Sequence, residues 1–160
     1  MRSMIMTLLV LLVLAGCKEH TKESVEIYNP LHTEYLQQYG WHIGQYYSET
    51  RFKANTLQDY QEHVDKIRTE GHVDLSPYLN KDVIETGYVL KEKTDHYNHI
   101  VVYILESGGA IIGSYLEFNH EVVQPNGEIQ VNAGQTTPMF PSNQQDEQYG
   151  IGRFVNANND

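Results

Sequence analysis

Hydrophobic residues gather in three consecutive runs in the second half of the chain, at residues 83–91, 100–106 and 110–118. Each run is rich in β-branched and aromatic residues, which favour strands. The short segment 107–109, Ser-Gly-Gly, is a compact hairpin signal between the last two runs. Because consecutive runs joined by short loops pair antiparallel, the pattern predicts an antiparallel meander.

Two segments carry apolar residues at the three-and-four-residue spacing of an amphipathic helix. The first, residues 30–39, follows Asn29, which suits an N-cap, and precedes Gly40, which suits a left-handed C-cap. The second opens with a capping-box-like sequence at 56–59 and stops at Gly71. The apolar positions of the two helices are Leu31, Tyr35, Leu36 and Tyr39, and Leu57, Tyr60, Val64 and Ile67.

The remaining segments give weaker patterns. Residues 41–55 alternate imperfectly and predict a strand with an irregular middle, and residues 122–131 predict one more hairpin. Residues 132–160 are dominated by polar residues, Gly and Pro without an apolar period, which predicts a flexible, disordered C-terminal tail.

These elements predict an α+β domain over residues 29–131. We expect two helices packed on one face of a small antiparallel sheet of roughly three to five strands. Cystatin-like and PepSY-like arrangements are the nearest analogies, and a fold analogy alone assigns no function.

The N-terminal residues 1–16 have a different character. Arg2 precedes an uncharged run rich in Leu and Val, which is too short to cross a bilayer and is typical of a secretory signal. The run ends in Leu14-Ala15-Gly16-Cys17, which closely resembles a bacterial lipobox. The resemblance implies cleavage between Gly16 and Cys17 and acylation of the Cys17 sulfur. The alternative is an ordinary signal peptide with a chance cysteine.

This interpretation predicts where the protein is located in the cell. Residues 17–28 become a polar tether, and acyl chains on Cys17 hold the domain at the extracytoplasmic face of the cell membrane. The chain contains no other cysteine, so acylation leaves no thiol for a disulfide, a cluster or a nucleophile. Membrane lipid is therefore the first expected partner.

The net charge of the chain argues against a further class of function. The chain has 21 acidic and 11 basic residues and a formal net charge of −10, so it lacks the basic footprint of a nucleic-acid-binding protein. We expect no nucleic-acid partner and no cofactor.

Candidate chemistry is sparse. His96 and His99 have a spacing that suits a shared metal, yet no third ligand lies nearby in sequence, and a solvated loop is the preferred interpretation. Glu85, Glu106 and Glu117 lie on three predicted strands and would have to meet for glycosidase-type catalysis.

The chain contains 12 tyrosines, which suit a half-wet core or an interface. Packing at the core boundary is the simpler explanation, and a peptide- or glycan-binding face is the alternative. The candidates for such a face are Tyr35, Tyr39, Tyr46 and Tyr47.

Two short motifs carry a resemblance to a known family. They are Tyr39-Gly40-Trp41 and the sequence Gly-x-x-Asp-Leu-Ser-x-Tyr over residues 71–78. Residues 33–118 resemble the domain-of-unknown-function 4830 family, found in lipoproteins and secreted proteins of Gram-positive spore-formers. Where family members often have Gly-Gly-Asp, this chain has Gly-Ser-Tyr at 113–115. The resemblance implies a small extracytoplasmic domain and brings no catalytic residues.

Three functions remain open at this point. The favoured one is a lipid-anchored, non-catalytic interaction module with a protein or glycan partner at the cell envelope, which requires no enzymatic activity. The alternatives are a carboxylate-based surface hydrolase and a binder of small ligands or metals.

Overall fold

The computed structural model describes residues 27–144 and 149–155. The predicted signal, the acylation site Cys17 and most of the tether lie outside these residues. Within the described ranges, no helix is both long and apolar enough to span a membrane. The elements in chain order are α1 (Pro30–Gln38), β1 (Ile43–Phe52), η1 (Leu57–Tyr60), α2 (Gln61–Thr69), η2 (Ser76–Tyr78), β2 (Val83–Leu90), β3 (Lys93–Thr94), β4 (His99–Ser107), β5 (Ala110–Val123), β6 (Ile129–Pro138) and β7 (Phe154–Val155).

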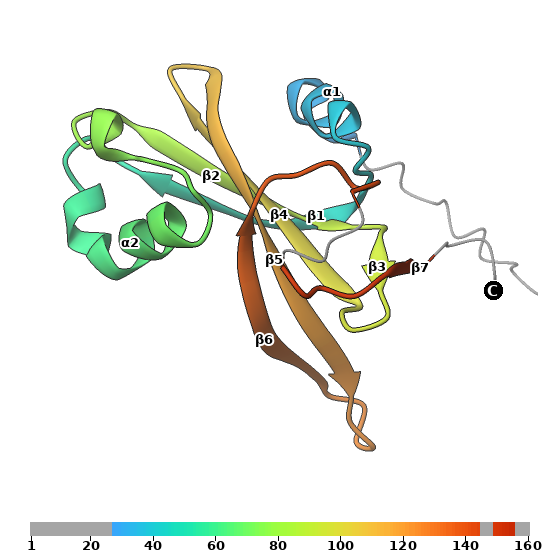
Figure 1. The fold of residues 1–160 in the computed structure, drawn as a ribbon. Coiled ribbons are helices and arrows are strands. Elements are labelled where there is room, and N and C mark those ends of the chain that lie inside the picture. The colour runs from blue at the N-terminus through green and yellow to red at the C-terminus, as the bar shows by residue number, and fades with distance from the viewer. Residues whose placement is uncertain (1–26, 145–148, 156–160) are drawn as a thin grey trace, which may run out of the picture.

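Five of the strands form one antiparallel sheet in the order β1-β2-β4-β5-β6 (Figure 1). β3 and β7 form a separate two-stranded ladder. The predicted α+β class, the meander of three central strands and the hairpin that follows it are confirmed. β5 runs to Val123, beyond the predicted end at Phe118.

The two helices begin in different ways. In α1 the side chain of Asn29 accepts a hydrogen bond from the Leu31 N–H at 3.0 Å, and Pro30 occupies the first turn, as predicted. The predicted capping box of the second helix is wrong. Thr56 makes no side-chain cap and instead donates its hydroxyl to the carbonyl of Lys53, and a turn of 3-10 helix, η1, precedes α2.

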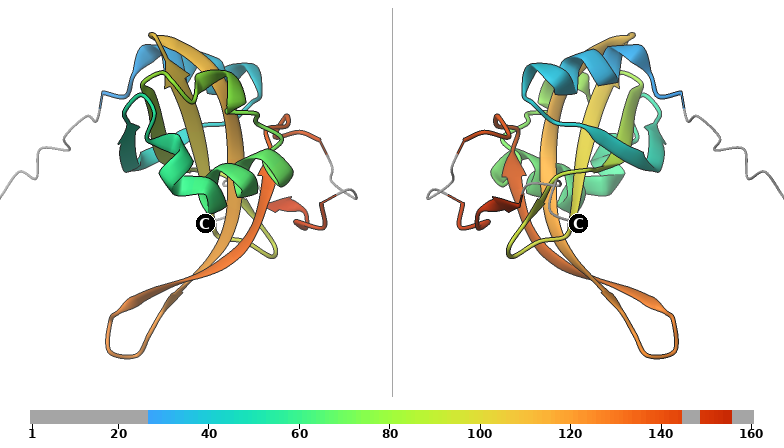
Figure 2. Two further views of the ribbon diagram at one scale, coloured as in Figure 1. Left: turned by 90° about the vertical axis from the view of Figure 1, so that its left-hand side faces the viewer. Right: turned by 90° about the vertical axis from the view of Figure 1, so that its right-hand side faces the viewer.

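The two helices lie on opposite faces of the sheet, so the expected packing on one face is wrong. In Figure 1, α1 lies above the strands and α2 below them, and Figure 2 shows the two helices from either end. Successive strand residues point to opposite faces. On β4, Val102 and Ile104 belong to the cluster of buried residues that includes Leu36 of α1, whereas Leu105 belongs to the cluster that includes Val64 and Ile67 of α2.

The C-terminal part of the chain also differs from expectation. The first residues of the predicted flexible tail form the end of β6, and Phe140 and Ile151 are buried in the α1-side core. The Trp41 indole N–H donates to the Phe140 carbonyl at 2.7 Å, and the Thr94 hydroxyl donates to the Ile151 carbonyl at 2.6 Å. The packed part of the chain therefore extends beyond residue 131, to β7.

Candidate functional site

A network of polar side chains lies on the sheet face that α2 partly covers. The buried carboxylate of Glu85 on β2 has one oxygen, Oε2, that accepts two hydrogen bonds. His63 of α2 donates from Nε2 at 3.0 Å, and Tyr115 of β5 donates its hydroxyl at 3.1 Å. Glu85 thus joins a helix and two strands through one atom.

The position of His63 follows from the local fold. α2 places its ring against the Phe52 ring, with centroids 5.9 Å apart and planes 28° from parallel. The hydrogen bond to Glu85 raises the pKa of His63, while burial of the ring opposes that rise. Burial, followed by the charge of Glu85, raises the pKa of Tyr115 and keeps its phenol a donor.

A second ion pair lies next to this network. Lys66 Nζ, one turn after His63 on α2, donates to Glu117 Oε1 on β5 at 2.8 Å. The ring of Tyr103 stacks on the ring of Tyr115, with centroids 4.9 Å apart and planes 16° from parallel. Burial raises the pKa of Tyr103 as well. Two stacked tyrosine rings and two pairs of acidic and basic side chains therefore lie close together on this face.

Tyr47, on the edge strand β1, adds a further aromatic ring to this group of side chains. The register of β1 against β2 shifts between Tyr46 and Ser48, so Tyr47 is the extra residue of a bulge. Its ring lies 6.4 Å from the Tyr103 ring and 5.8 Å from the His99 ring, both edge-on. Tyr46 instead meets Tyr88 on the other side of the sheet. The bulge therefore aims two adjacent tyrosines at opposite faces.

A shallow hollow opens beside the helix that carries these contacts. It has a volume of about 440 Å³ and is lined by residues of η1 and α2, among them Tyr60, His63 and Lys66. We name the combined surface the tyrosine face. It is defined by Tyr47, Tyr103, Tyr115, Glu85, Glu117, His63 and Lys66.

The opposite face holds a similar but buried network. His32 of α1 is 2% exposed and contacts Glu106 Oε2 through Nε2 and the Tyr88 hydroxyl through Nδ1, both at 2.8 Å. Nε2 can donate to the Glu106 carboxylate, and in that tautomer Nδ1 can accept from the Tyr88 hydroxyl. Burial raises the pKa of Tyr88 to about 12, which keeps the phenol protonated. This network fastens α1 to the sheet.

The three candidate carboxylates do not converge. Glu85 and Glu117 share the tyrosine face, whereas Glu106 bonds His32 on the other face. The two that share a face are paired with His63 and Lys66 respectively.

His96 and His99 lie next to different carboxylates. His99 Nδ1 lies 3.1 Å from Glu121 Oε2, while His96 Nε2 lies 3.8 Å from Asp95 Oδ1. His99 is buried, and its Nε2 has no hydrogen-bond partner. Over the described ranges, no group of three His, Cys, Asp or Glu side chains is placed to hold a metal ion.

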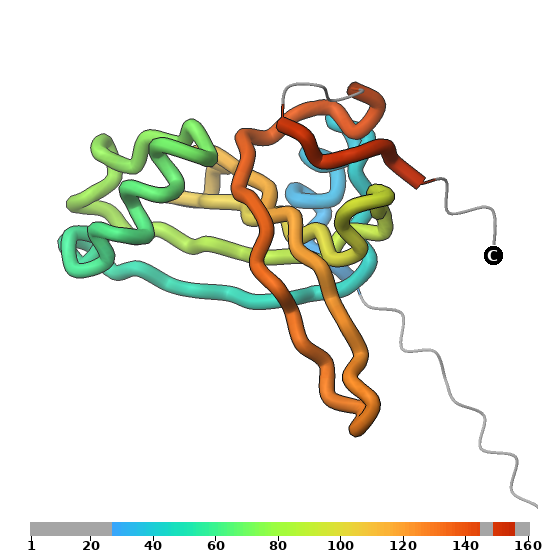
Figure 3. Tube along the Cα trace, turned by 60° about the horizontal axis from the view of Figure 1, so that its bottom comes forward, coloured from blue at the N-terminus to red at the C-terminus, as the bar shows by residue number. Residues whose placement is uncertain are grey.

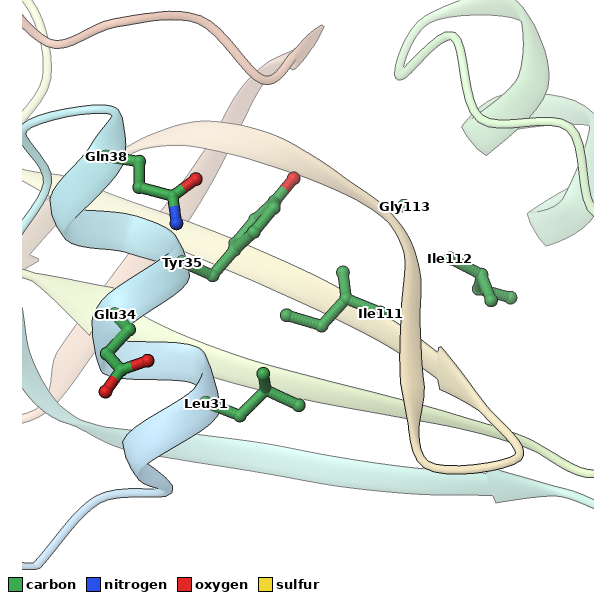
Figure 4. A pocket seen from close by; sticks show the side chains of 7 residues that line it. All are labelled: Leu31, Glu34, Tyr35, Gln38, Ile111, Ile112 and Gly113. Carbon is green, nitrogen blue, oxygen red and sulfur yellow. The ribbon is translucent and has the colours of Figure 1, made fainter.

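Tyr35 and Tyr39 are separated from Tyr47 by the sheet. Their rings contact each other at 5.3 Å, and the Tyr35 hydroxyl bonds the Ser114 hydroxyl at 2.7 Å. Burial raises the pKa of Tyr35. Figure 4 shows Tyr35 beside a second hollow, of about 410 Å³, between α1 and the β4–β5 hairpin. Of the four candidate tyrosines, only Tyr47 lies on the tyrosine face.

Sequence reasoning missed the roles of His32 and His63. Each histidine lies on a predicted helix, but its partners are 22 to 74 residues away on strands. The signal that points to His63 is its helical position beside Val64 and Ile67, at the border of the buried face.

Comparison of this chain with protein-family models, curated proteins and solved structures gives no match. The resemblance to the 4830 family stays a prediction from its two motifs.

Proposed function

We propose that this protein is a lipid-anchored, extracytoplasmic interaction module, without catalytic activity, whose tyrosine face binds a neutral glycan of the cell envelope. The observation that carries the proposal is an exposed aromatic ring, Tyr47, which lies edge-on to the ring of Tyr103, on the same face as two carboxylates that are each paired with a basic side chain. The anchor is supported by the sequence Leu14-Ala15-Gly16-Cys17.

The balance of charge favours a neutral ligand. His63 and Lys66 offset Glu85 and Glu117 when His63 is protonated, so the residues that define the tyrosine face have no excess of either sign, while Asp59 and Glu62 line the adjoining hollow. A strongly charged partner would gain little from such a surface. A sugar offers hydroxyls to the partly exposed His63, Lys66 and Glu117, and a C–H face to the ring of Tyr47.

The same geometry speaks against carboxylate catalysis. A glycosidase keeps one carboxyl protonated as an acid and the other free as a base or nucleophile. Glu85 and Glu117 already pair with His63 and Lys66, and the third candidate, Glu106, lies on the other face, so these carboxylates are not placed as a free pair around a substrate. The cystatin-like and PepSY-like analogies assume helices on one face and support no part of this proposal.

Binding is tested with neutral cell-envelope oligosaccharides titrated by calorimetry into the protein and two variants. Tyr47→Ala should weaken binding at least tenfold, because truncation of an aromatic side chain at the centre of a binding surface costs about 2 kcal/mol or more. Tyr46→Ala is the matched control, since Tyr46 is 47% exposed, Tyr47 is 46% exposed and the two face opposite ways. Equal loss in both variants, or binding of peptides alone, contradicts the glycan proposal.

The anchor has a separate test. Cys17→Ala should abolish incorporation of radiolabelled fatty acid and release the protein from the membrane fraction. Unchanged retention of the variant contradicts the lipid anchor and leaves the binding experiment unaffected.

A further inference from the structure

The last strand of the main sheet has an open outer edge. β6 ends the strand order β1-β2-β4-β5-β6, and its residues 129–134 are all exposed. Figure 3 shows the outer part of β5 and β6 projecting from the body of the domain as an arm. Over the described residues, β6 makes no backbone hydrogen bond outside its pairing with β5.

The two edges of the sheet are protected very differently. β1 carries Glu49 and Arg51 and has two register irregularities, features that block pairing with another strand. β6 has no charged residue, and none follows it until Asp146, in a chain of net charge −10. Its irregularity against β5 lies near Gly134, so residues 129–133 form a regular, unguarded edge.

The side chains of this edge divide cleanly between its faces. Ile129, Val131 and Ala133 alternate with Gln130 and Asn132, so one face is apolar and the other carries amides. Ile129 is 63% exposed and Val131 is 44% exposed. A monomer gains nothing from leaving this apolar stripe in water.

We propose that β6 pairs antiparallel with β6 of a second copy, around a two-fold axis at Val131. This register sets Val131 against its own mate, Ile129 against Ala133, and Gln130 against Asn132. Apolar groups meet apolar groups on one face and amides meet amides on the other, as a self-complementary interface requires. Two five-stranded sheets become one continuous sheet.

A second copy fits this edge better than an unrelated strand does. In the register centred on Val131 the edge matches itself, and β6 contributes no charged residue that would meet its own copy there. The arm also holds this edge away from α1 and α2 (Figure 3).

Disulfide trapping on intact cells tests both pairing and register. Val131→Cys in the full-length chain should form a disulfide-linked dimer under mild oxidation, because directly opposed residues have Cβ atoms about 4.5–5.5 Å apart. Gln130→Cys is the matched control, since its own mate lies diagonally at about 7–8 Å, beyond disulfide reach. The unmodified chain measures the background from Cys17.

The expected result is several-fold more dimer from Val131→Cys than from Gln130→Cys or the unmodified chain. In a second measurement, Val131→Lys should shift the purified full-length chain from dimer to monomer in sedimentation velocity, while Gln45→Lys on β1 leaves the dimer intact. Equal trapping at positions 130 and 131, a cross-link to a different protein, or a monomeric unmodified chain overturns the proposal. None of these outcomes depends on glycan binding.

Discussion

Replacing Ile151 by alanine tests whether the C-terminal segment is part of the core. Ile151 is fully buried in the cluster that contains Trp41 and Phe140. The change removes three carbon atoms, about 2.4 kcal/mol at about 0.8 kcal/mol for each, and the cavity left behind brings the expected cost to about 2–5 kcal/mol. With a urea dependence of about 1.5–2 kcal/mol per M, a loss of about 3 kcal/mol lowers the unfolding midpoint by roughly 1.5–2 M.

The fluorescence of Trp41 is a direct reporter for this measurement. It is the single tryptophan of the chain, it is 1% exposed, and its ring contacts Phe140 and Phe154. Val155→Ala is the control, because Val155 lies in the same segment but is 52% exposed and should change stability by less than about 0.5 kcal/mol. A midpoint for Ile151→Ala that matches the control would refute the packed segment and restore the flexible tail.

The two histidine networks give further predictions. Because Glu85 raises the pKa of His63 in the folded state, the stabilisation from His63 is present below its unfolded pKa of about 6.5 and is lost as pH rises through the folded value. The stability gap between the parent chain and His63→Gln in urea titrations should therefore be larger at pH 5.5 than at pH 8.5, and an equal gap would contradict the ion pair. His32→Ala should cost about 1–3 kcal/mol, because it leaves the buried Tyr88 hydroxyl and the largely buried Glu106 carboxylate without their partner. His42→Ala, at an exposed pair, should cost less than about 1 kcal/mol, and similar losses for the two variants would show that the His32 network does not hold α1.

Local signals predicted the local elements well. Asn29 and Pro30 gave the start of α1, and the Ser-Gly-Gly turn at 107–109 gave the β4–β5 hairpin, since each depends on backbone preferences of a few adjacent residues. The face covered by each helix could not be predicted in this way. It depends on the pairing of Leu36 and Ile67 with strand residues far along the chain.

The C-terminal segment was missed for a related reason. Phe140, Ile151 and Phe154 are scattered through a mostly polar segment, and no helical or strand period links them. Phe140 and Ile151 are buried and Phe154 is partly buried, because side chains from this segment pack around Trp41 and complete the layer on the α1 side of the sheet. Such a layer has no periodic signature, because its backbone is neither helix nor strand where most of the contacts are made.

The two histidine networks suggest how one sheet serves a structural face and a binding face. Both join a helical histidine to a glutamate and a tyrosine on different strands, yet His32 is buried, while the side chain of His63 is 35% exposed at the rim of a hollow. A fully buried network is satisfied by its own members and has no free surface to offer. In the His63 network Glu85 and Tyr115 are buried, and His63 is the member that reaches solvent, at the rim of the hollow, so a ligand can contact its ring while the hydrogen bond to Glu85 is kept. A binding surface on this chain is therefore expected on the α2 side of the sheet, and α1 serves to close the core behind it.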